Sequence, residues 1–222
     1  MYSIKIYQLI IAFCILSSTT ALGSSLEKSM LIKNQINNFS TTKKNKDMIS
    51  EWELHGDRMI KYVNNITLIK QPQIKIYNTD TTINIKSDSA IDPSGEMEEI
   101  YLKNNVLIKE KYLYDVQPMK IYTSYAIYYV SKNLIETDRE VTIITADSVT
   151  TGLGLSANIN TGITKILSNV KRIVKENNES RTIMGNQMIY NSNNSKWIVK
   201  DTPANDLKTT ITKKVITTFD IK

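Results

Sequence analysis

Few side chains in this sequence have the types and spacing that catalysis or metal binding requires. The chain holds one histidine, His55, and one cysteine, Cys14. One residue of each kind cannot complete a zinc, haem or iron–sulfur ligand set, so we expect no metal and no cofactor. A histidine-based catalytic triad would have to use His55, which we interpret as a surface residue. Serine and lysine are abundant, but no pair stands out as a nucleophile and its base.

Two other short patterns suggest chemistry and are better explained by structure. Residues 152–157 read Gly-Leu-Gly-Leu-Ser-Ala and match the dinucleotide-binding pattern G-x-G-x-x-A. That pattern needs a helix directly after it to bind the pyrophosphate, whereas residues 158–162 are turn formers, so we interpret the glycines as a turn. Glu96, Glu98 and Glu99 lack the spacing of a calcium-binding loop, and we expect them to face solvent.

The basic character of the chain is not specific for nucleic-acid binding. The formal net charge is +6, with 28 lysine and arginine residues in total. A nucleic-acid-binding domain more typically clusters arginine with exposed aromatic residues on one face. The basic residues here are scattered along the chain, so we expect no nucleic-acid partner.

The amino terminus has the pattern of an export signal. Lys5 precedes a short apolar run over residues 6–16. If that run continues as a helix to Gly23, it is roughly 27 Å long and just crosses a bilayer, so we expect residues 1–23 to form a retained transmembrane helix. The alternative is cleavage after Gly23, because residues 21–23 place small side chains where a signal peptidase reads them.

After this segment the composition changes twice. Residues 24–48 are rich in Ser, Lys, Asn and Thr, so we expect a polar tether, with a short helix over residues 26–36 as the alternative. From residue 49 onward the apolar residues recur with a period of two, and Ile, Val, Tyr and Thr carry the pattern. Turn-forming residues separate these runs, as at 92–95 and 191–194. Many short strands with such spacing predict an all-β fold.

A weak internal repeat supports a sheet built from similar hairpins. Asp88 is followed by Asn105 in a strand-turn-strand segment, and Asp147 is followed by Asn169 in a second segment of the same kind. A repeated unit of this size cannot bury its own apolar face, so we expect the units to stack into one extended sheet.

In order along the chain, several segments resemble the lipopolysaccharide-export protein family LptC. The segments are Trp52-Glu53-Leu54, Gln71-Pro72-Gln73-Ile74, residues 85–90 (Ile-Lys-Ser-Asp-Ser-Ala), 101–106 (Tyr-Leu-Lys-Asn-Asn-Val), 121–127, 136–142 and 151–155. The resemblance covers about residues 1–176. It implies a twisted, open β-jelly-roll of mostly antiparallel strands over residues 49–176, preceded by one transmembrane helix.

The resemblance also implies a function. The protein would be a single-pass component of the bacterial inner membrane with its C-terminal domain in the periplasm. It would accept lipopolysaccharide from the permeases of an ABC transporter complex and pass it to the soluble periplasmic carrier LptA. Movement between two like apolar troughs needs no chemistry by this chain, so we expect it not to be an enzyme.

The inward positions of the clearest strands are the expected lipid-binding residues: Ile83, Ile85, Val106, Ile108, Ile121, Thr123, Tyr125 and Ile143. This assignment depends on strand register, since a shift of one residue moves a whole strand's inward set to the outer face. Ordinary core packing at these positions is the alternative.

Residues 177–222 extend beyond the family pattern and contain further strand-like runs. We expect them to lengthen the roll and to move the carrier-docking edge to the last strand. Three other functions compete with the one above: a soluble LptA-like carrier released by signal cleavage, a hydrolase on a β scaffold, and an envelope structural protein that binds no ligand.

Overall fold

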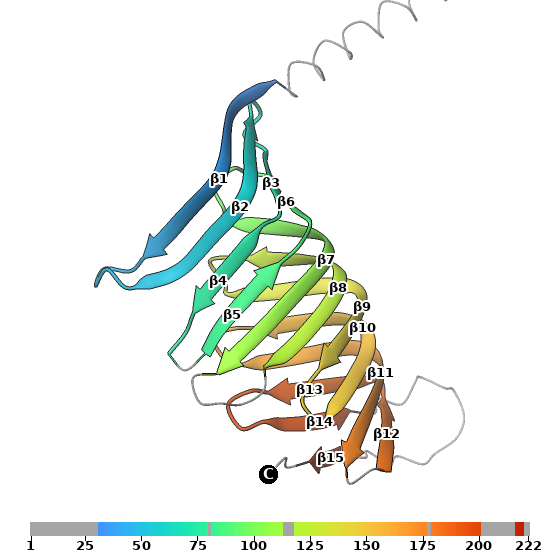
Figure 1. Cartoon of the computed structure of the whole chain (residues 1–222). Helices are drawn as coiled ribbons and strands as arrows, with labels where there is room; N and C mark the ends of the chain where they lie inside the picture. Colours follow the sequence, from blue (N-terminus) through green and yellow to red (C-terminus); the bar gives the residue numbers. More distant parts are fainter. Residues whose placement is uncertain (1–30, 80, 113–117, 177–178, 201–215, 220–222) are drawn as a thin grey trace, which may run out of the picture.

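The protein is seen here as a computed structural model, which describes residues 31–79, 81–112, 118–176, 179–200 and the backbone of 216–219. In these residues every regular element is a β-strand, and neighbouring strands pair antiparallel in one folded sheet (Figure 1). The strands are β1 (Ile32–Lys44), β2 (Ser50–Tyr62), β3 (Thr67–Lys70), β4 (Gln73–Tyr77), β5 (Thr81–Lys86), β6 (Ser89–Asp92), β7 (Glu99–Tyr112), β8 (Met119–Tyr129), β9 (Leu134–Ile144), β10 (Ser148–Asn158), β11 (Ile163–Glu176), β12 (Glu179–Gly185), β13 (Gln187–Asn191), β14 (Lys196–Lys200) and β15 (Ile216–Phe219).

Long strands pass through two half-sheets that face each other. The first half of β2 pairs with β4 and its second half with β3. In the same way β7 is shared between β6 and β5, and β11 between β13 and β12. The first half-sheet therefore contains β4, β5 and β12, together with the halves of the long strands that pair with them. The second contains β3, β6, β13 and β14, together with the other halves of the long strands. This arrangement agrees with the predicted all-β jelly-roll of antiparallel strands.

Each long strand bends where it passes from one half-sheet to the other. The pairing register breaks between Lys103 and Val106 in β7 and between Thr123 and Ile127 in β8. Asn104 and Asn105 lie there with φ of 59° and 48°, a left-handed conformation that asparagine tolerates better than most residues. The breaks lie side by side in neighbouring strands, so together they fold the sheet double.

The internal repeat marks two of these bends. Asn169 in β11 has φ of 54° and corresponds in the repeat to Asn105 in β7. The residue after each asparagine, Val106 or Val170, is buried. In the first unit the Asn105 amide donates a hydrogen bond to the Asp88 carboxylate at 2.7 Å. The repeated sequence therefore specifies where a strand turns from one half-sheet into the other.

The apolar core fills the space between the half-sheets. Its side chains alternate along the strands, as the period of two predicts, and the largest fully buried ones are Trp197, Tyr128, Leu54, Ile69, Ile74, Ile85, Ile100, Leu102, Ile121, Ile135, Ile143 and Leu155. Both half-sheets contribute to this set. The core is therefore a single layer of interdigitating side chains between two walls of one folded sheet.

The polar-tether prediction is wrong for residues 32–44, because these residues form β1. β1 pairs along its length with β2, and its other edge has no strand partner among the described residues. Of its thirteen residues only Phe39 is buried. This strand is held mainly by backbone pairing with β2 and not by burial of an alternating apolar face. The amino-acid composition therefore does not indicate it.

Phe39 attaches β1 to the body of the protein. It is the register partner of Gly56, and its ring covers that glycine so closely that a Cβ on Gly56 would lie 2.6 Å from Phe39 Cε1. Aromatic rings commonly cover strand glycines in this way. The contact needs both a large ring on β1 and the absence of a side chain on β2.

The predicted membrane helix at residues 1–23 and the tether residues up to 30 lie outside the described part of the chain. Within the described part, no helix has the length and apolar character needed to span a bilayer.

We expect Phe39→Ala to lower the free energy of unfolding by about 3 kcal/mol, because it removes a buried ring from its packing partner. The amides of β1 should also exchange with solvent faster than those of β7. Urea unfolding and hydrogen exchange measure the two effects. Ile36→Ala is the matched control, because Ile36 lies on the same strand and is 47% exposed. Equal losses in the two variants would contradict the role given to Phe39.

Candidate functional site

Six of the eight predicted lipid-binding residues lie in the core. Ile83, Ile85, Val106, Ile108, Ile121 and Ile143 are all less than 7% exposed. They come from β5, β7, β8 and β9, and all of them lie in the first half-sheet. They therefore form one wall of the apolar interior. Their contact with lipid stays a prediction.

Thr123 and Tyr125 lie at the bend of β8, and the inward position predicted for Tyr125 is wrong. Ile121 is buried before the register break, whereas Ala126 and Tyr128 are buried after it, so the parity of the strand changes within the bend. Tyr125 therefore faces outward, where its ring packs edge-on against Tyr101 with centroids 6.5 Å apart. A bulge moves side chains between faces in this way, and the alternation seen in the sequence does not reveal it.

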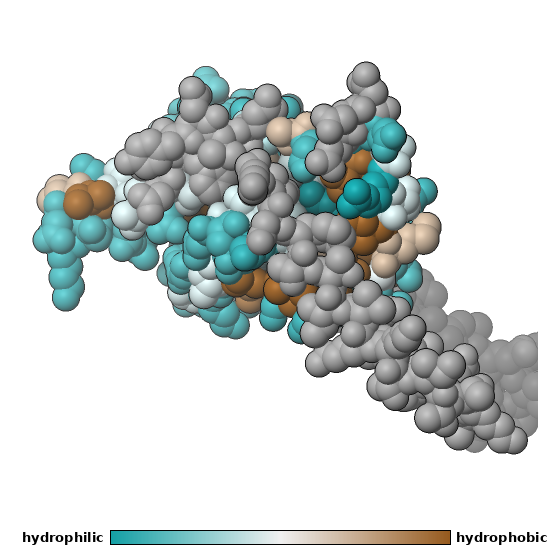
Figure 2. All heavy atoms as spheres, turned by 90° about the horizontal axis from the view of Figure 1, so that it is seen from below, coloured by the Kyte–Doolittle hydropathy of each residue, from teal (hydrophilic) through white to brown (hydrophobic). Residues whose placement is uncertain are grey.

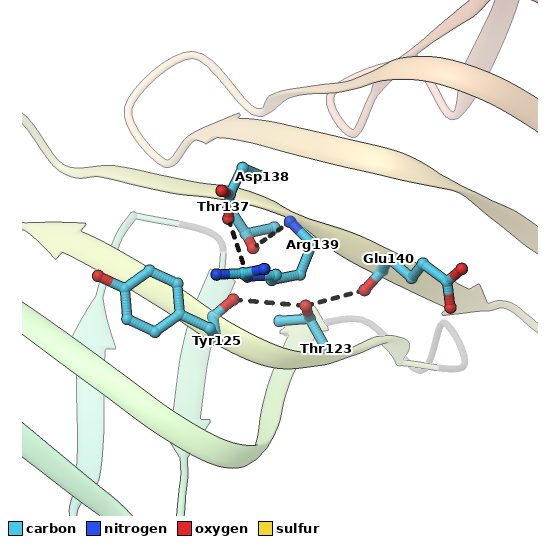
Figure 3. Close-up of polar contacts among 6 residues, drawn as sticks. All are labelled: Thr123, Tyr125, Thr137, Asp138, Arg139 and Glu140. Atoms are coloured by element: carbon cyan, nitrogen blue, oxygen red, sulfur yellow. Dashed lines mark hydrogen bonds and ion pairs between the residues drawn. The ribbon is translucent and has the colours of Figure 1, made fainter.

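Thr123 holds the bend rather than lining the interior. Its hydroxyl donates to the Glu140 carbonyl at 2.9 Å and to the Tyr125 carbonyl at 3.3 Å (Figure 3). On the neighbouring strand β9, the Thr137 hydroxyl accepts from the Arg139 backbone N–H at 3.0 Å. These bonds satisfy backbone groups that the interrupted ladder leaves unpaired.

The second wall of the interior escaped the sequence prediction. Its long strands contribute the buried residues Ile100, Leu102, Ala126, Tyr128, Ile135, Leu155, Ala157 and Ile166. The signal that could have found them is the pair Asn104-Asn105, because asparagines in the middle of an apolar alternation indicate a bend. Beyond such a bend the inward positions have to be assigned afresh.

A small cavity lies between the two walls, on the side opposite the bends of the long strands. Its volume is ≈ 30 Å³. The first half-sheet lines it with Ile83, Ile108, Glu110, Met119 and Ile121, and the second with Ile135, Ala157, Asn158, Ile159, Gly162 and Thr164. A space of this size holds about two water molecules. A hydrocarbon chain would enter only if the two walls moved apart at this side, which we call the mouth.

One hydrogen-bonded tyrosine stands on the second wall near the mouth. Tyr128 is 1% exposed, and its hydroxyl donates to Asn133 Oδ1 at 3.1 Å. Burial raises the pKa of Tyr128 well above its usual value, so the phenol is neutral at physiological pH. The second wall therefore carries no charge at this position.

The C-terminal end of the interior is covered by the strands beyond β11. Trp197 on β14 is 1% exposed and stacks on Tyr190 of β13, with ring centroids 4.6 Å apart. Trp197 also contacts β11, because the Arg172 guanidinium lies 4.1 Å from the centre of the indole ring. Seen from this end, hydrophobic residues show between hydrophilic ones toward the middle of the molecule (Figure 2). The extension thus packs onto the same core.

Arg172 is a poorly satisfied cation. Its side chain is 4% exposed, and the Asp147 carboxylate lies 3.8 Å from Nη2, beyond hydrogen-bonding distance. Among the described residues, Arg172 Nη1, Trp197 Nε1 and Thr150 Oγ1 are buried and have no hydrogen-bond partner. Burial lowers the pKa of Arg172, and the nearby Asp147 charge opposes that shift. The cluster therefore costs stability that the stacking on Trp197 only partly offsets.

The other chemical patterns have structural explanations. His55 is on the surface, as predicted, with 48% of its side chain exposed and Nε2 3.5 Å from Glu53 Oε2. Gly152 and Gly154 lie inside β10, so the predicted glycine turn is wrong. They form the bend of that strand, where a Cβ on Gly152 would lie 2.4 Å from Ile166 Cγ2. Strand β11 follows this segment, so the helix that a dinucleotide site requires is not there.

Among the described residues, no group of three or more His, Cys, Asp and Glu side chains is arranged to hold a metal ion.

The family model for lipopolysaccharide-assembly, LptC-related proteins matches residues 8–176. The chain belongs to the LptC family. Members of this family act in lipopolysaccharide transport and assembly, and the family is not a known enzyme family. The comparison with curated proteins found no match. The LptC match ends at Glu176, so the strands that cover Arg172 lie beyond the part that the family shares.

We expect Arg172→Met to leave the free energy of unfolding within about 1 kcal/mol of the parent, or to raise it, because an apolar side chain of similar length removes an unsatisfied buried charge. Trp197→Ala removes the indole that packs against Arg172, and it should lower the free energy of unfolding by about 3–5 kcal/mol. Urea unfolding of both variants tests this. A loss above about 2 kcal/mol for Arg172→Met would mean that the guanidinium has a strong partner.

Proposed function

We propose that this LptC-family protein is anchored in the inner membrane and carries lipopolysaccharide across part of the periplasm. It accepts the lipid from an ABC transporter complex and passes it to a soluble periplasmic carrier such as LptA. The observation that carries the proposal is the continuous apolar interior between two half-sheets, with its mouth along one side. The family role in lipopolysaccharide transport supports it.

The energetics of acyl chains require such an interior. A chain of about 12 carbons exposed to water costs on the order of 10 kcal/mol, at ~0.8 kcal/mol for each methylene. The two walls offer Ile, Leu, Val and Ala side chains along the whole length from β4 to β11. Moving a chain from one such interior to another is nearly neutral in free energy, so the ATPase of the transporter has to supply the direction.

The two ends of the folded sheet suit docking by strand addition. The outer edge of β1, which has no strand partner among the described residues, is long and exposed. It carries apolar residues such as Ile32 and Ile36 that are about half exposed. An unpaired edge of this kind accepts a strand from another β domain. We propose that the transporter's permeases dock at the β1 end, and that the carrier docks at the opposite end, on the last strand.

The soluble-carrier alternative rests on the small residues 21–23 near the amino terminus. The two functions differ in the mature chain, because a carrier would begin after Gly23 and an anchored protein would keep residues 1–23. The intact mass of the purified chain separates them.

For the lipid-binding wall, we expect a photo-crosslinking residue at Ile108 or Ile121 to capture lipopolysaccharide strongly. The same residue at Lys86 or Lys120 should capture little, since these side chains alternate with the wall residues. Tyr125 is a third control, because the bend turns it outward. Capture is measured by immunoblot after irradiation of cells. Equal capture at wall and control positions would overturn the assignment of the interior.

For the docking edge, deletion of residues 177–222 should abolish carrier binding and leave permease binding intact. Because this deletion also uncovers the core at Arg172, a shorter deletion of residues 201–222 is needed, which keeps Trp197 in place. Pull-down assays with the purified carrier and permease complex measure both contacts, and circular dichroism checks the fold. Full carrier binding by the shorter variant would show that the docking edge is not the last strand.

A further inference from the structure

The turn between β10 and β11 folds an apolar side chain into the mouth. This turn, residues 158–162, is Asn-Ile-Asn-Thr-Gly, and its one large apolar residue, Ile159, is only 6% exposed. Ile159 borders the cavity opposite Ile83, Ile108 and Met119 of the first half-sheet. A turn residue with four polar or small neighbours would ordinarily face solvent. Ile159 instead lies between the edges of the two half-sheets at the mouth, which we call the rims.

The turn is fastened firmly to its own half-sheet. The Ile159 backbone N–H donates to the Asn133 carbonyl at 2.8 Å, and the Asn133 amide donates to Asn160 Oδ1 at 2.9 Å. On the other side, the Gly162 carbonyl accepts from the Ser192 N–H at 2.8 Å. These contacts join the turn to the β8–β9 and β13–β14 turns on the same rim.

A hydrogen bond also links the turn to the opposite rim. Asn78, directly after β4 in the first half-sheet, donates from Nδ2 to the Ile159 carbonyl at 3.3 Å. This bond links the 158–162 turn to the first half-sheet across the mouth. It is a long bond between neutral groups, so it is among the weaker kinds.

We propose that Ile159 is the gate of the mouth, and that acyl chains enter when the Asn78–Ile159 contact separates. This inference rests on the proposed lipid-transport function and adds the residue that controls access to the interior. The cavity of ≈ 30 Å³ behind Ile159 is too small for an acyl chain, so loading requires this side chain to leave the space between the rims. When the rims part, the turn stays attached to the second half-sheet through its backbone bonds to Asn133 and Ser192.

The test measures how fast the full chain takes up lipopolysaccharide that carries an environment-sensitive fluorophore on an acyl chain. Ile159→Ala should speed loading at least about tenfold, because it removes the side chain that fills the mouth. Ile159→Val, which keeps most of the volume, should load within roughly threefold of the parent. Asn78→Ala should speed loading roughly 2- to 10-fold through loss of one neutral hydrogen bond.

Two matched controls lie on the same rims. Thr161→Ala alters the same turn at an exposed position, and Thr79→Ala alters the residue next to Asn78, also exposed. Both should load at the parental rate. Asn78 and Thr79 are on the surface, so the comparison between their variants stands even if Ile159→Ala proves poorly folded.

The outcomes separate the gate from the transport function. If the parent loads lipid and the Ile159→Ala and Asn78→Ala variants load at its rate, the gate is refuted and the transport function stands. If neither the parent nor any variant takes up lipid, the transport function fails and the gate fails with it. Faster loading in Ile159→Ala and Asn78→Ala but not in the controls supports the gate.

Discussion

The structure depends on the need to bury one face of a long antiparallel sheet without a second sheet or a helix to cover it. In the described residues no helix is present, so the sheet covers itself by folding double. Every long strand has to bend at the same level for this to work, and the bends of β7, β8, β10 and β11 occur where the pairing register breaks or a residue takes a left-handed conformation. In β7, β10 and β11, asparagine or glycine at the bend lowers the conformational energy of the left-handed backbone.

At the bends the walls are joined covalently through each long strand. Along the opposite side, the described residues of the two walls meet through side chains and turns. The core is packed, and under the proposed function the walls move apart along this side. A protein that binds a hydrocarbon reversibly needs this combination, because an open apolar groove in water would favour aggregation.

The C-terminal extension changes how the interior ends. Trp197 and Tyr190 come from strands beyond the LptC match, and they cover a cation, Arg172, that lies within it. A buried guanidinium whose Nη1 has no acceptor among the described residues is an unfavourable neighbour for hydrocarbon. The apolar core continues into β13 and β14 through Met188, Trp197 and Val199, so the extension closes this end of the interior around a buried charge.

The sequence by itself determined the all-β character of the chain beyond residue 49, turns such as those at 92–95 and 191–194, and the inward residues of the regular strand segments. Period-two alternation was enough to predict Ile83, Ile85 and Ile108 as inward, because a strand with one buried face needs such a pattern. It also indicated the family through ordered short motifs. β1 was missed because only Phe39 among its residues is buried, so no alternation could mark it.

Only the tertiary structure decided which side chains meet across the fold. Tyr125 follows the alternation in the sequence and yet faces outward, because the register break in β8 depends on how that strand pairs with β9. The contacts of Ile159 with Asn78, and of Arg172 with Trp197, join residues far apart in the chain. Such contacts are set by the folding of the whole sheet on itself, a long-range arrangement that local residue patterns do not encode.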